Sequence, residues 1–330
     1  MTRTLVVGGT GFLGSAIAAT ALAAGHDVSI LTRGQTTALA GVTPLVADRF
    51  GPMDALRGQQ FDLVFDTCAY VPGAVEHLLT AVQPRRYVMI SSISVHDRFD
   101  RPDLTESSPV PEATADDLIP FRAVDFAKWG QVPVRPESYG PLKRSCELAA
   151  LGDRAIILRA GLLVGAGDRS DRLTWWVRRL DQGGRIPVPT NRKIQMIDVR
   201  DVADFAVKSA VTDASGIFNV TSNPFELFSL LDEIQTLSGT ASTLIPLPDQ
   251  AFIDAGVGPW MNLPLWLPDT PDHAYFFDIT TARACGIGLK TRPMAQTLCP
   301  LLDWDRTRRT IPLATGLTTA QEAQLLADQP

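Results

Sequence analysis

Tyr139 and Lys143 are the residues whose types and spacing first suggest chemistry, since they form a Tyr-x-x-x-Lys pattern. The spacing puts both side chains on one face of a predicted helix over residues 138–151, with Ser138 as N-cap and Pro141 in the first turn. A phenol loses its proton only near pH ~10, so acid–base work at neutral pH needs a neighbouring ammonium group that favours the phenolate. Alone, the pair also fits the surface of an ordinary amphipathic helix.

A serine at a predicted strand end lies upstream of this pair. Residues 86–91 form an apolar run typical of a buried strand, and the segment Ser92-Ile93-Ser94-Val95-His96 follows it. Ligands of parallel sheets bind at the carboxyl ends of the strands. The Ser92 hydroxyl is therefore placed to hydrogen-bond the reacting oxygen of a substrate.

A glycine-rich loop lies near the N-terminus of the chain. The run Gly8-Gly9-Thr10-Gly11-Phe12-Leu13-Gly14 follows the apolar residues 5–7 and precedes an alanine-rich segment that ends at Gly25. This order predicts the strand–loop–helix–strand unit of dinucleotide-binding proteins, in which glycines let a pyrophosphate approach the helix start. A purely structural glycine turn is the alternative.

The elements that position these residues alternate between strand and helix. Further strands are predicted at residues 43–47, 62–66, 86–91 and 154–159, and helices at 53–57, 73–82 and 138–151. The strands are continuous apolar runs, as in a parallel sheet that is covered on both faces. The predicted fold class is therefore α/β, a doubly wound parallel (Rossmann) sheet with a smaller C-terminal substrate lobe.

The expected organisation has two parts. A dinucleotide-binding domain covers residues 1–166, and a substrate-binding lobe covers 167–330, with 197–221 returning to the first domain. Within the first part, the proline-rich residues 97–137 are expected to be an irregular surface excursion. A capping-box pattern at residues 319–322 predicts a short terminal helix.

Composition narrows the class of protein. A hydrophobic content of 45% with 20% charged residues describes an ordinary globular protein, and the net charge of −6 argues against one built to wrap nucleic acid. No apolar run approaches membrane-spanning length, and a predicted strand begins within a few residues of the N-terminus, so a cytoplasmic protein is expected. The four cysteines lack metal-ligand spacing, and no metal site is expected.

These patterns together resemble the short-chain dehydrogenase/reductase superfamily, in its extended or atypical branch that is similar to NAD-dependent epimerases and dehydratases. Gly8, Gly11 and Gly14 match the family's Gly-x-x-Gly-x-x-Gly, while Tyr139 and Lys143 match its catalytic pair. The resemblance implies that Tyr139 exchanges the hydroxyl proton, that Lys143 assists it and binds a ribose, and that Ser92, the third catalytic residue, holds the oxygen.

The resemblance also implies a nicotinamide cofactor and a small-molecule substrate. The expected cofactor-binding residues are Gly8, Thr10, Gly11, Phe12, Leu13, Gly14, Thr32, Arg33, Asp48, Thr67, Ala69, Ser91, Tyr139, Lys143, Ala160, Gly161 and Leu162. The expected substrate-binding residues are Ser92, His96, Arg172, Trp175 and Arg192.

Two departures from the family pattern refine these expectations. Thr32 and Arg33 stand where relatives that use NAD usually carry an acid, so NADP is expected to be preferred over NAD. Ile93 and Ser94 replace the Asp-Glu pair of dehydratases, so dehydration is disfavoured.

The sequence thus predicts an NAD(P)-dependent oxidoreductase or epimerase that moves a hydride to or from a carbonyl or secondary alcohol of a polar, sugar-nucleotide-like substrate. The alternative is an RNA-binding or cofactor-sensing Rossmann protein without redox turnover. No nucleic acid and no membrane is expected as a partner, and a homodimer is left open.

Overall fold

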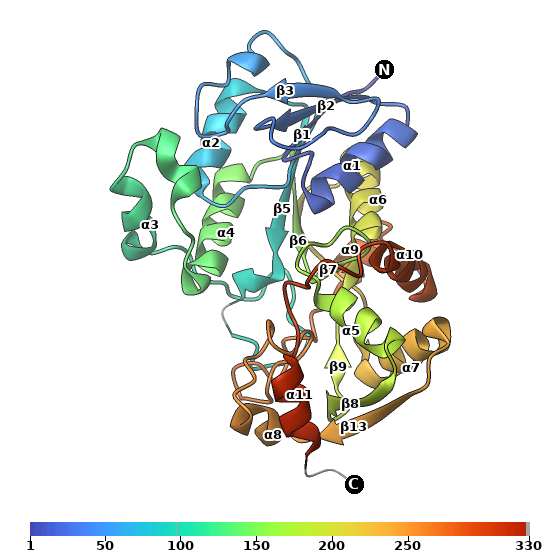
Figure 1. Ribbon diagram of the computed structural model, residues 1–330. Coiled ribbons are helices and arrows are strands. Elements are labelled where there is room, and N and C mark those ends of the chain that lie inside the picture. The colour runs from blue at the N-terminus through green and yellow to red at the C-terminus, as the bar shows by residue number, and fades with distance from the viewer. Residues whose placement is uncertain (97, 328–330) are drawn as a thin grey trace.

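The computed structural model describes residues 1–96 and 98–327, arranged as a large α/β lobe and a smaller lobe (Figure 1). Asp97, the first residue of the excursion expected at 97–137, lies outside the described residues. The large lobe is built on a seven-stranded parallel sheet in the order β11-β6-β5-β4-β1-β2-β3, which confirms the doubly wound fold. Its strands are β1 (Arg3–Val7), β2 (Asp27–Thr32), β3 (Thr43–Val46), β4 (Leu63–Asp66), β5 (Arg86–Ser92), β6 (Ala155–Ala160) and β11 (Gly216–Val220).

Helices cover both faces of this sheet. One face carries α1 and α6, and the other carries α2 and α4. One 3-10 turn lies between β3 and β4, and two lie between β5 and α4. The bounds are α1 (Phe12–Ala23), α2 (Pro72–Ala81), α3 (Ala115–Arg122), α4 (Pro136–Ala150) and α6 (Val199–Ala210), with η1 (Asp54–Leu56), η2 (Ile93–Val95) and η3 (Phe126–Gln131).

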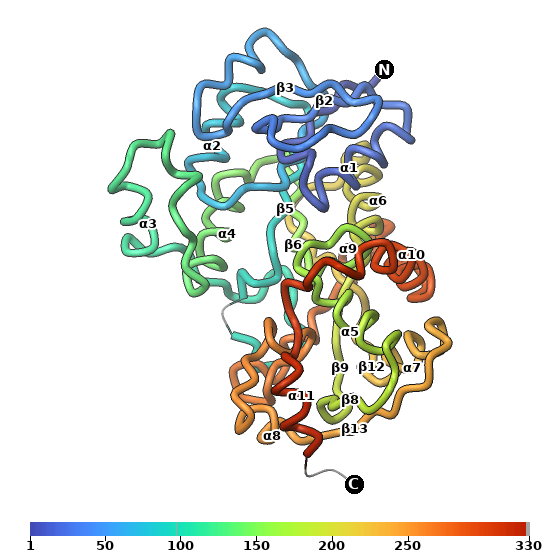
Figure 2. The backbone as a smooth tube through the Cα atoms, viewed as in Figure 1, coloured from blue at the N-terminus to red at the C-terminus, as the bar shows by residue number. Residues whose placement is uncertain are grey.

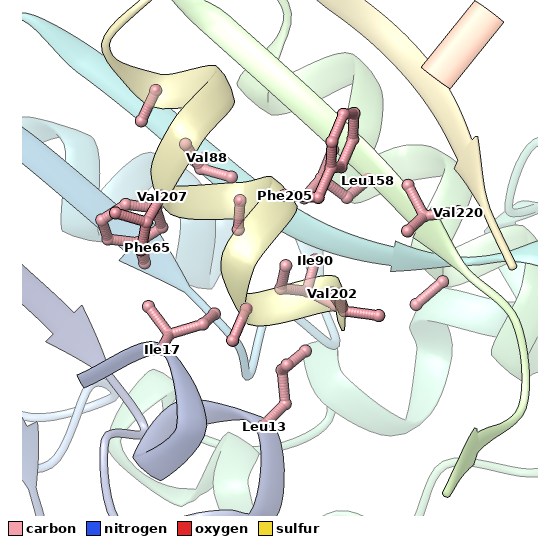
Figure 3. Packing of buried hydrophobic residues seen from close by; sticks show 14 of the residues in the cluster. Leu13, Ile17, Phe65, Val88, Ile90, Leu158, Val202, Phe205, Val207 and Val220 are labelled. Atoms are coloured by element: carbon pink, nitrogen blue, oxygen red, sulfur yellow. The ribbon is translucent and has the colours of Figure 1, made fainter. Parts of the chain in front are cut away.

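Successive side chains of a strand point to opposite faces of the sheet, so a continuous apolar strand contributes to the core on both faces. In β5, Val88 and Ile90 face the α1/α6 side, whereas Met89 faces the α2/α4 side. Figure 3 shows Val202 and Phe205 of α6 packed over the first of these faces, with side chains of α1 beside them. The strand order reverses between β1 and β4, which is where a doubly wound sheet opens a crevice at its carboxyl edge.

The smaller lobe has its own apolar core. Trp176 and Trp266 are fully buried there, between helices and the parallel pair β8–β13. The lobe contains helices α5 (Arg172–Asp181), α7 (Leu227–Ser238), α8 (Asp249–Asp254) and α11 (Thr319–Leu326), and strands β8 (Gly184–Pro189), β9 (Lys193–Ile194), β12 (Phe225–Glu226) and β13 (Ser242–Leu247). Between or beside the lobes lie β7 (Leu163–Val164), β10 (Ile197–Asp198), α9 (Ala282–Gly286) and α10 (Ala295–Arg306).

The chain passes between the lobes more than once. It leaves the large sheet after β6, forms α5 and β8 below, returns through α6 and β11, and leaves again (Figure 2). Among the described residues, no helix is both long and apolar enough to cross a bilayer.

Several boundaries differ from the sequence-based expectations. The segment expected to be irregular contains α3, because Thr114 and Asp117 form a capping box at its start. The terminal capping box is centred on Thr318, one residue earlier than predicted, and pairs it with Gln321.

The helix that carries Tyr139 and Lys143 also starts earlier than predicted. α4 begins at Pro136, a residue preorganised for the first helical position, so Arg135 and not Ser138 is the N-cap. Ser138 instead donates a hydrogen bond to Asp117 Oδ1 (2.6 Å), and Pro141 falls inside the helix beyond the first turn.

A buried ion pair fastens α4 to the sheet. Glu147 of α4 is fully buried and accepts two hydrogen bonds from Arg159 of β6 (2.8 and 2.9 Å) and one from Ser91 of β5 (2.7 Å). Arg144 adds a fourth at 3.1 Å. Burial alone would raise the pKa of Glu147, but these donors hold it below its ordinary value.

We therefore expect Glu147→Gln to lower the free energy of unfolding by about 3–5 kcal/mol, because it leaves the buried Arg159 guanidinium without its counter-charge. Urea denaturation of the variant measures the loss. Glu137→Gln, at an exposed position of the same helix, is the matched control and should change stability by less than about 1 kcal/mol. Equal stability of the two variants would contradict the assigned role.

Candidate active site

A cavity of about 1160 Å³ opens at the carboxyl edge of the large sheet and extends to the smaller lobe. It is lined by the glycine loop, by the ends of β4, β5 and β6, by α4 and by residues of the smaller lobe. Every residue expected to bind the cofactor lines it, with the exception of Ala69, which is buried. The carbonyl of Ala69 instead accepts a hydrogen bond from Lys143.

The glycine loop has the geometry of a phosphate cradle. Gly8 has φ +79°, and its carbonyl accepts a hydrogen bond from the Gly11 N–H (2.9 Å). A Cβ on Gly14 would lie 2.2 Å from the Gly8 oxygen, so only glycine allows this helix–strand approach. A Cβ on Gly11 would meet only that oxygen, at 3.2 Å, so the helix start is open to the cavity. No side chain caps α1 and no acid lies in its first turn, which leaves its N–H groups available to an anion.

The end of β2 lines the cavity through Thr32 and Arg33. Thr32 Oγ1 lies 3.5 Å from Thr10 Oγ1 and accepts a hydrogen bond from Gly34 N–H (3.3 Å). Arg33 is exposed and, among the described residues, has no hydrogen-bond or ion-pair partner. The Asp48 carboxylate accepts a hydrogen bond from Phe50 N–H (3.0 Å).

The cavity is also lined by a buried arginine, Arg49, that was not anticipated from the sequence. Arg49 donates two hydrogen bonds to Asp66 at the end of β4 (2.8 and 2.9 Å) and a third to the Ala74 carbonyl (3.0 Å). Tyr87 also donates to Asp66 (2.8 Å). Burial would raise the pKa of Asp66, yet Arg49 and Tyr87 hold it below its ordinary value. These partners are far apart in the sequence and show no spacing pattern, so the pair carried no sequence signal.

Lys143 is held in place by main-chain carbonyls. Its ammonium group is buried and donates to Ala69 O (2.8 Å) and Ile90 O (2.6 Å). An ammonium has three donors, so one remains for a further partner. The charge therefore has a fixed position on the same side of α4 as Tyr139, which also lines the cavity.

Gly140 brings α4 against the end of β5. A Cβ at this position would lie 2.0 Å from the Ser94 carbonyl oxygen, so any other residue would push the helix away. Ser92 Oγ accepts the Ser94 N–H (3.1 Å), which leaves the Ser92 hydroxyl proton free to donate. Ser92, Tyr139 and Lys143 thus line one part of the cavity from two elements in close contact.

Tyr70 is an additional aromatic residue at this part of the cavity. Its ring centroid lies 6.5 Å from that of Tyr139 and 5.3 Å from Lys143 Nζ. Although 46% of Tyr70 is exposed, desolvation of its hydroxyl, reinforced by Tyr139, raises the pKa of Tyr70 to about 12. Tyr70 therefore stays protonated at neutral pH. Its position after β4 was the only available sequence signal.

Of the residues expected to bind substrate, Ser92 and Arg172 line the cavity, whereas three others do not. Trp175 is buried in the core of the smaller lobe, edge-to-face with Trp176 at 4.6 Å. Arg192 is paired with Asp249 and donates to the Leu267 carbonyl (2.7 Å).

His96 is the third residue outside the cavity. It is 2% exposed and packs edge-to-face with Phe99 at 6.3 Å. Neither ring nitrogen has a hydrogen-bond partner among the described residues. Burial, together with Arg159 and Arg101, lowers the pKa of His96 to about 4, while Glu147 acts in the opposite direction.

Other residues complete the cavity wall. Trp260 and Phe276 contribute from the smaller lobe and pack edge-to-face at 5.4 Å. The segment around α3 and η3 contributes Phe121, Trp129, Gly130, Gln131, Val132 and Val134. These positions lie in segments without clear periodicity, so the sequence did not single them out.

Comparison with known proteins agrees with this geometry. The sequence model of the NAD dependent epimerase/dehydratase family matches residues 4–82, which include the glycine loop, β2 and β4. Residues 4–82 are thus similar to this family. No curated protein matches the sequence significantly.

Several solved structures share the overall fold over most of this chain. A UDP-N-acetylglucosamine 4-epimerase from Bacillus cereus is 16% identical (TM-score 0.65), with 93% of this chain and 100% of that chain covered. The Bordetella bronchiseptica enzyme WbmH, solved with NAD+, is 15% identical (TM-score 0.63; 93% and 99% covered). The human epimerase family protein SDR39U1, solved with NADPH, is 17% identical (TM-score 0.59; 92% and 99% covered).

The buried ring of His96, which has no hydrogen-bond partner among the described residues, predicts a pH dependence of stability. The ordinary pKa of histidine is about 6.5. Above this pH, His96 is neutral in both the folded and the unfolded state, and its effect on the free energy of unfolding does not change with pH. Between about pH 6.5 and 4 only the unfolded state takes up the proton, so stability falls with falling pH. The free energy of unfolding lost in this way is on the order of 3 kcal/mol once the pH has fallen below the folded-state pKa of about 4.

We expect His96→Phe to remove this component, because phenylalanine keeps the ring contact with Phe99 and does not titrate. Urea unfolding of wild type and variant at pH 7.5 and 5.0 measures it. The variant should be at least as stable at pH 7.5, since no hydrogen bond is lost, and should lose less stability at pH 5.0. A parallel loss in both proteins would show that His96 does not control the effect.

Proposed function

We propose that this protein is an NAD(P)-dependent oxidoreductase or epimerase. It moves a hydride between the nicotinamide and a carbonyl or secondary-alcohol carbon of a polar, sugar-nucleotide-like substrate. The observation that carries the proposal is the convergence of Ser92, Tyr139 and Lys143 on the same cavity as an uncapped helix start. The sugar-nucleotide part rests on the similarity to a UDP-N-acetylglucosamine 4-epimerase.

The residues present fit a nicotinamide dinucleotide. The open helix start at Gly11 would hold the pyrophosphate, and the remaining Lys143 donor would hold a ribose hydroxyl. When bound, the nicotinamide supplies or accepts a hydride.

The protein's own residues manage the proton. In the reduction direction, Tyr139 donates its hydroxyl proton to the substrate oxygen as the carbonyl becomes an alcohol, and it takes the proton back in oxidation. The fixed Lys143 charge favours the phenolate form that results. The free Ser92 hydroxyl donates a hydrogen bond to the same oxygen and orients it. Epimerisation requires the same groups acting in both directions.

The alternative functions fit less well. An RNA-binding protein needs a basic face, and this chain has a net charge of −6. A cofactor sensor without turnover has no need of both Tyr139 and Lys143, and here both line the cavity. An RNA gel shift and a carbonyl panel with reduced cofactor separate the three functions.

Tyr139→Phe tests the proposed role most directly. We expect turnover to fall by about 10²–10⁴-fold, since the variant has no hydroxyl to exchange the proton. Cofactor affinity, measured by calorimetry, should stay within a few-fold of wild type. Tyr70→Phe is the matched control, because it removes the hydroxyl of the neighbouring ring and leaves Tyr139 and Lys143 unchanged. Full activity of the Tyr139 variant would remove this residue from the mechanism.

We also propose that NADP is preferred over NAD. Arg33 lines the cavity without a partner among the residues that the structure describes, beside the hydroxyl of Thr32 rather than an acid. A phosphate on the adenosine ribose can take a charge-assisted hydrogen bond from this guanidinium, of about 1.5–3 kcal/mol. Relatives are solved with either cofactor, since WbmH holds NAD+ and the human protein NADPH.

The expected result is that NADPH binds about 10- to 100-fold more tightly than NADH in wild type. Thr32→Asp combined with Arg33→Asn should reverse this order, because the new acid repels the phosphate and accepts hydrogen bonds from free ribose hydroxyls. Calorimetric titration of both cofactors into both proteins decides the question. Equal affinities in wild type, or tighter NADH binding, would exclude the preference.

A further inference from the structure

Arg172 reaches the catalytic cavity from the smaller lobe. It is the first residue of α5 and lies on the cavity wall together with Tyr139. Its Nε donates to Ser170 Oγ (3.0 Å), and Ser170 in turn donates to the Asp168 carboxylate (2.7 Å). This chain of hydrogen bonds fixes one edge of the guanidinium.

An aromatic ring holds one face of the same group. Arg172 Cζ lies 5.4 Å from the ring centroid of Trp260, within the range of a cation–π contact. Burial lowers the pKa of Arg172, while Asp168 and Tyr139 act in the opposite direction. The guanidinium is therefore oriented before any ligand arrives.

The two outer nitrogens of Arg172 differ from those of neighbouring arginines. Among the described residues, neither Nη has a hydrogen-bond or ion-pair partner. On the same helix, Arg178 is paired with Asp305 and Arg179 with Glu322. A half-buried arginine that keeps two free donors in a cavity is suited to bind a planar anion through both nitrogens.

The other cations of the cavity are engaged or distant. Arg49 is paired with Asp66, and Lys143 donates to two carbonyls. Arg33 lies at the end of β2, on the side proposed for the adenosine. In the described part of the cavity, the substrate side therefore offers one guanidinium with unused donors, while the nearby Asp168 carboxylate already accepts hydrogen bonds from Ser170.

We infer that the substrate carries a carboxylate within a few bonds of the carbon that exchanges the hydride, and that Arg172 binds this carboxylate through its two Nη atoms. The inference rests on the proposed oxidoreductase function and specifies its substrate class. A guanidinium binds carboxylate and phosphate alike through two nitrogens, but a carboxylate carries one charge, whereas a phosphate monoester carries nearly two and would keep part of its charge unpaired beside one arginine. The contact would anchor the substrate at one end while Ser92 and Tyr139 act at the carbonyl oxygen.

Paired compounds test the inference. Wild type, Arg172→Gln, Arg172→Lys and the control Arg154→Gln are assayed with reduced cofactor on 2-oxo and 3-oxo acids. Each acid is matched with its methyl ester and with a ketone of similar size that carries a phosphate. Arg154 is exposed and outside the cavity. The second readout is calorimetric binding of the corresponding hydroxy acids to protein saturated with NADPH, a combination that cannot react.

We expect wild type and Arg154→Gln to favour an acid over its ester by about 100-fold in kcat/KM, and to bind the hydroxy acid. Arg172→Gln should lose most of this difference and the binding, with cofactor affinity unchanged. Arg172→Lys should retain only part of the preference for the acid and of the hydroxy-acid binding, because an ammonium group lacks the planar donor geometry of a guanidinium.

Esters or phosphorylated ketones turned over as well as acids would overturn the carboxylate assignment while leaving the proposed function intact. The same holds if Arg172→Gln keeps the preference for acids. If no compound is turned over, the proposed function fails for this panel, and the calorimetric titration decides the inference by itself. Hydroxy-acid binding that Arg172→Gln abolishes would support it, and absence of binding to wild type would reject it.

Discussion

The candidate site depends on one buried electrostatic contact, the pairing of Glu147 with Arg159. It joins α4, which carries Tyr139 and Lys143, to β6, and Ser91 extends the same network to β5. These two strands also carry the residues that line the cavity beside α4. A buried charge pair contributes little net stability compared with apolar packing, but it permits one arrangement of its partners. Here it fixes how helix and strands are placed relative to each other.

Main-chain contacts refine this arrangement. Gly140 lets α4 approach the Ser94 carbonyl, and the carbonyls of Ala69 and Ile90 hold the ammonium of Lys143. Backbone atoms move less than side chains, so both contacts position Tyr139 and Lys143 with little freedom. The smaller lobe then supplies a further wall of the cavity, including Arg172 and Trp260. In the proposed function, chemistry and substrate recognition thus come from different lobes.

Much of the large lobe could be predicted from the sequence, because its signals are local. The glycine loop, the apolar strands and the Tyr139/Lys143 spacing each depend on residues close in the chain. The smaller lobe could not be predicted in this way. Whether Arg192 is free depends on Asp249, far along the sequence, and Trp175 differs from Trp260 only in where the folded chain places it. Even the start of α4 differs from the prediction, since the helix begins at Pro136 and not after Ser138.

The path of the chain between the lobes limits how such a protein can be divided or recombined. A cut after residue 166 would remove β11 and α6, so β6 would become an edge strand and one face of the sheet would lose half its cover. The cofactor-binding lobe is therefore not a portable module that can be joined to another substrate lobe at one junction. An exchange between relatives would need matched crossings near residues 164, 197 and 221. New substrate specificities are then reached more easily by changing side chains such as those at 172 and 260 than by swapping whole lobes.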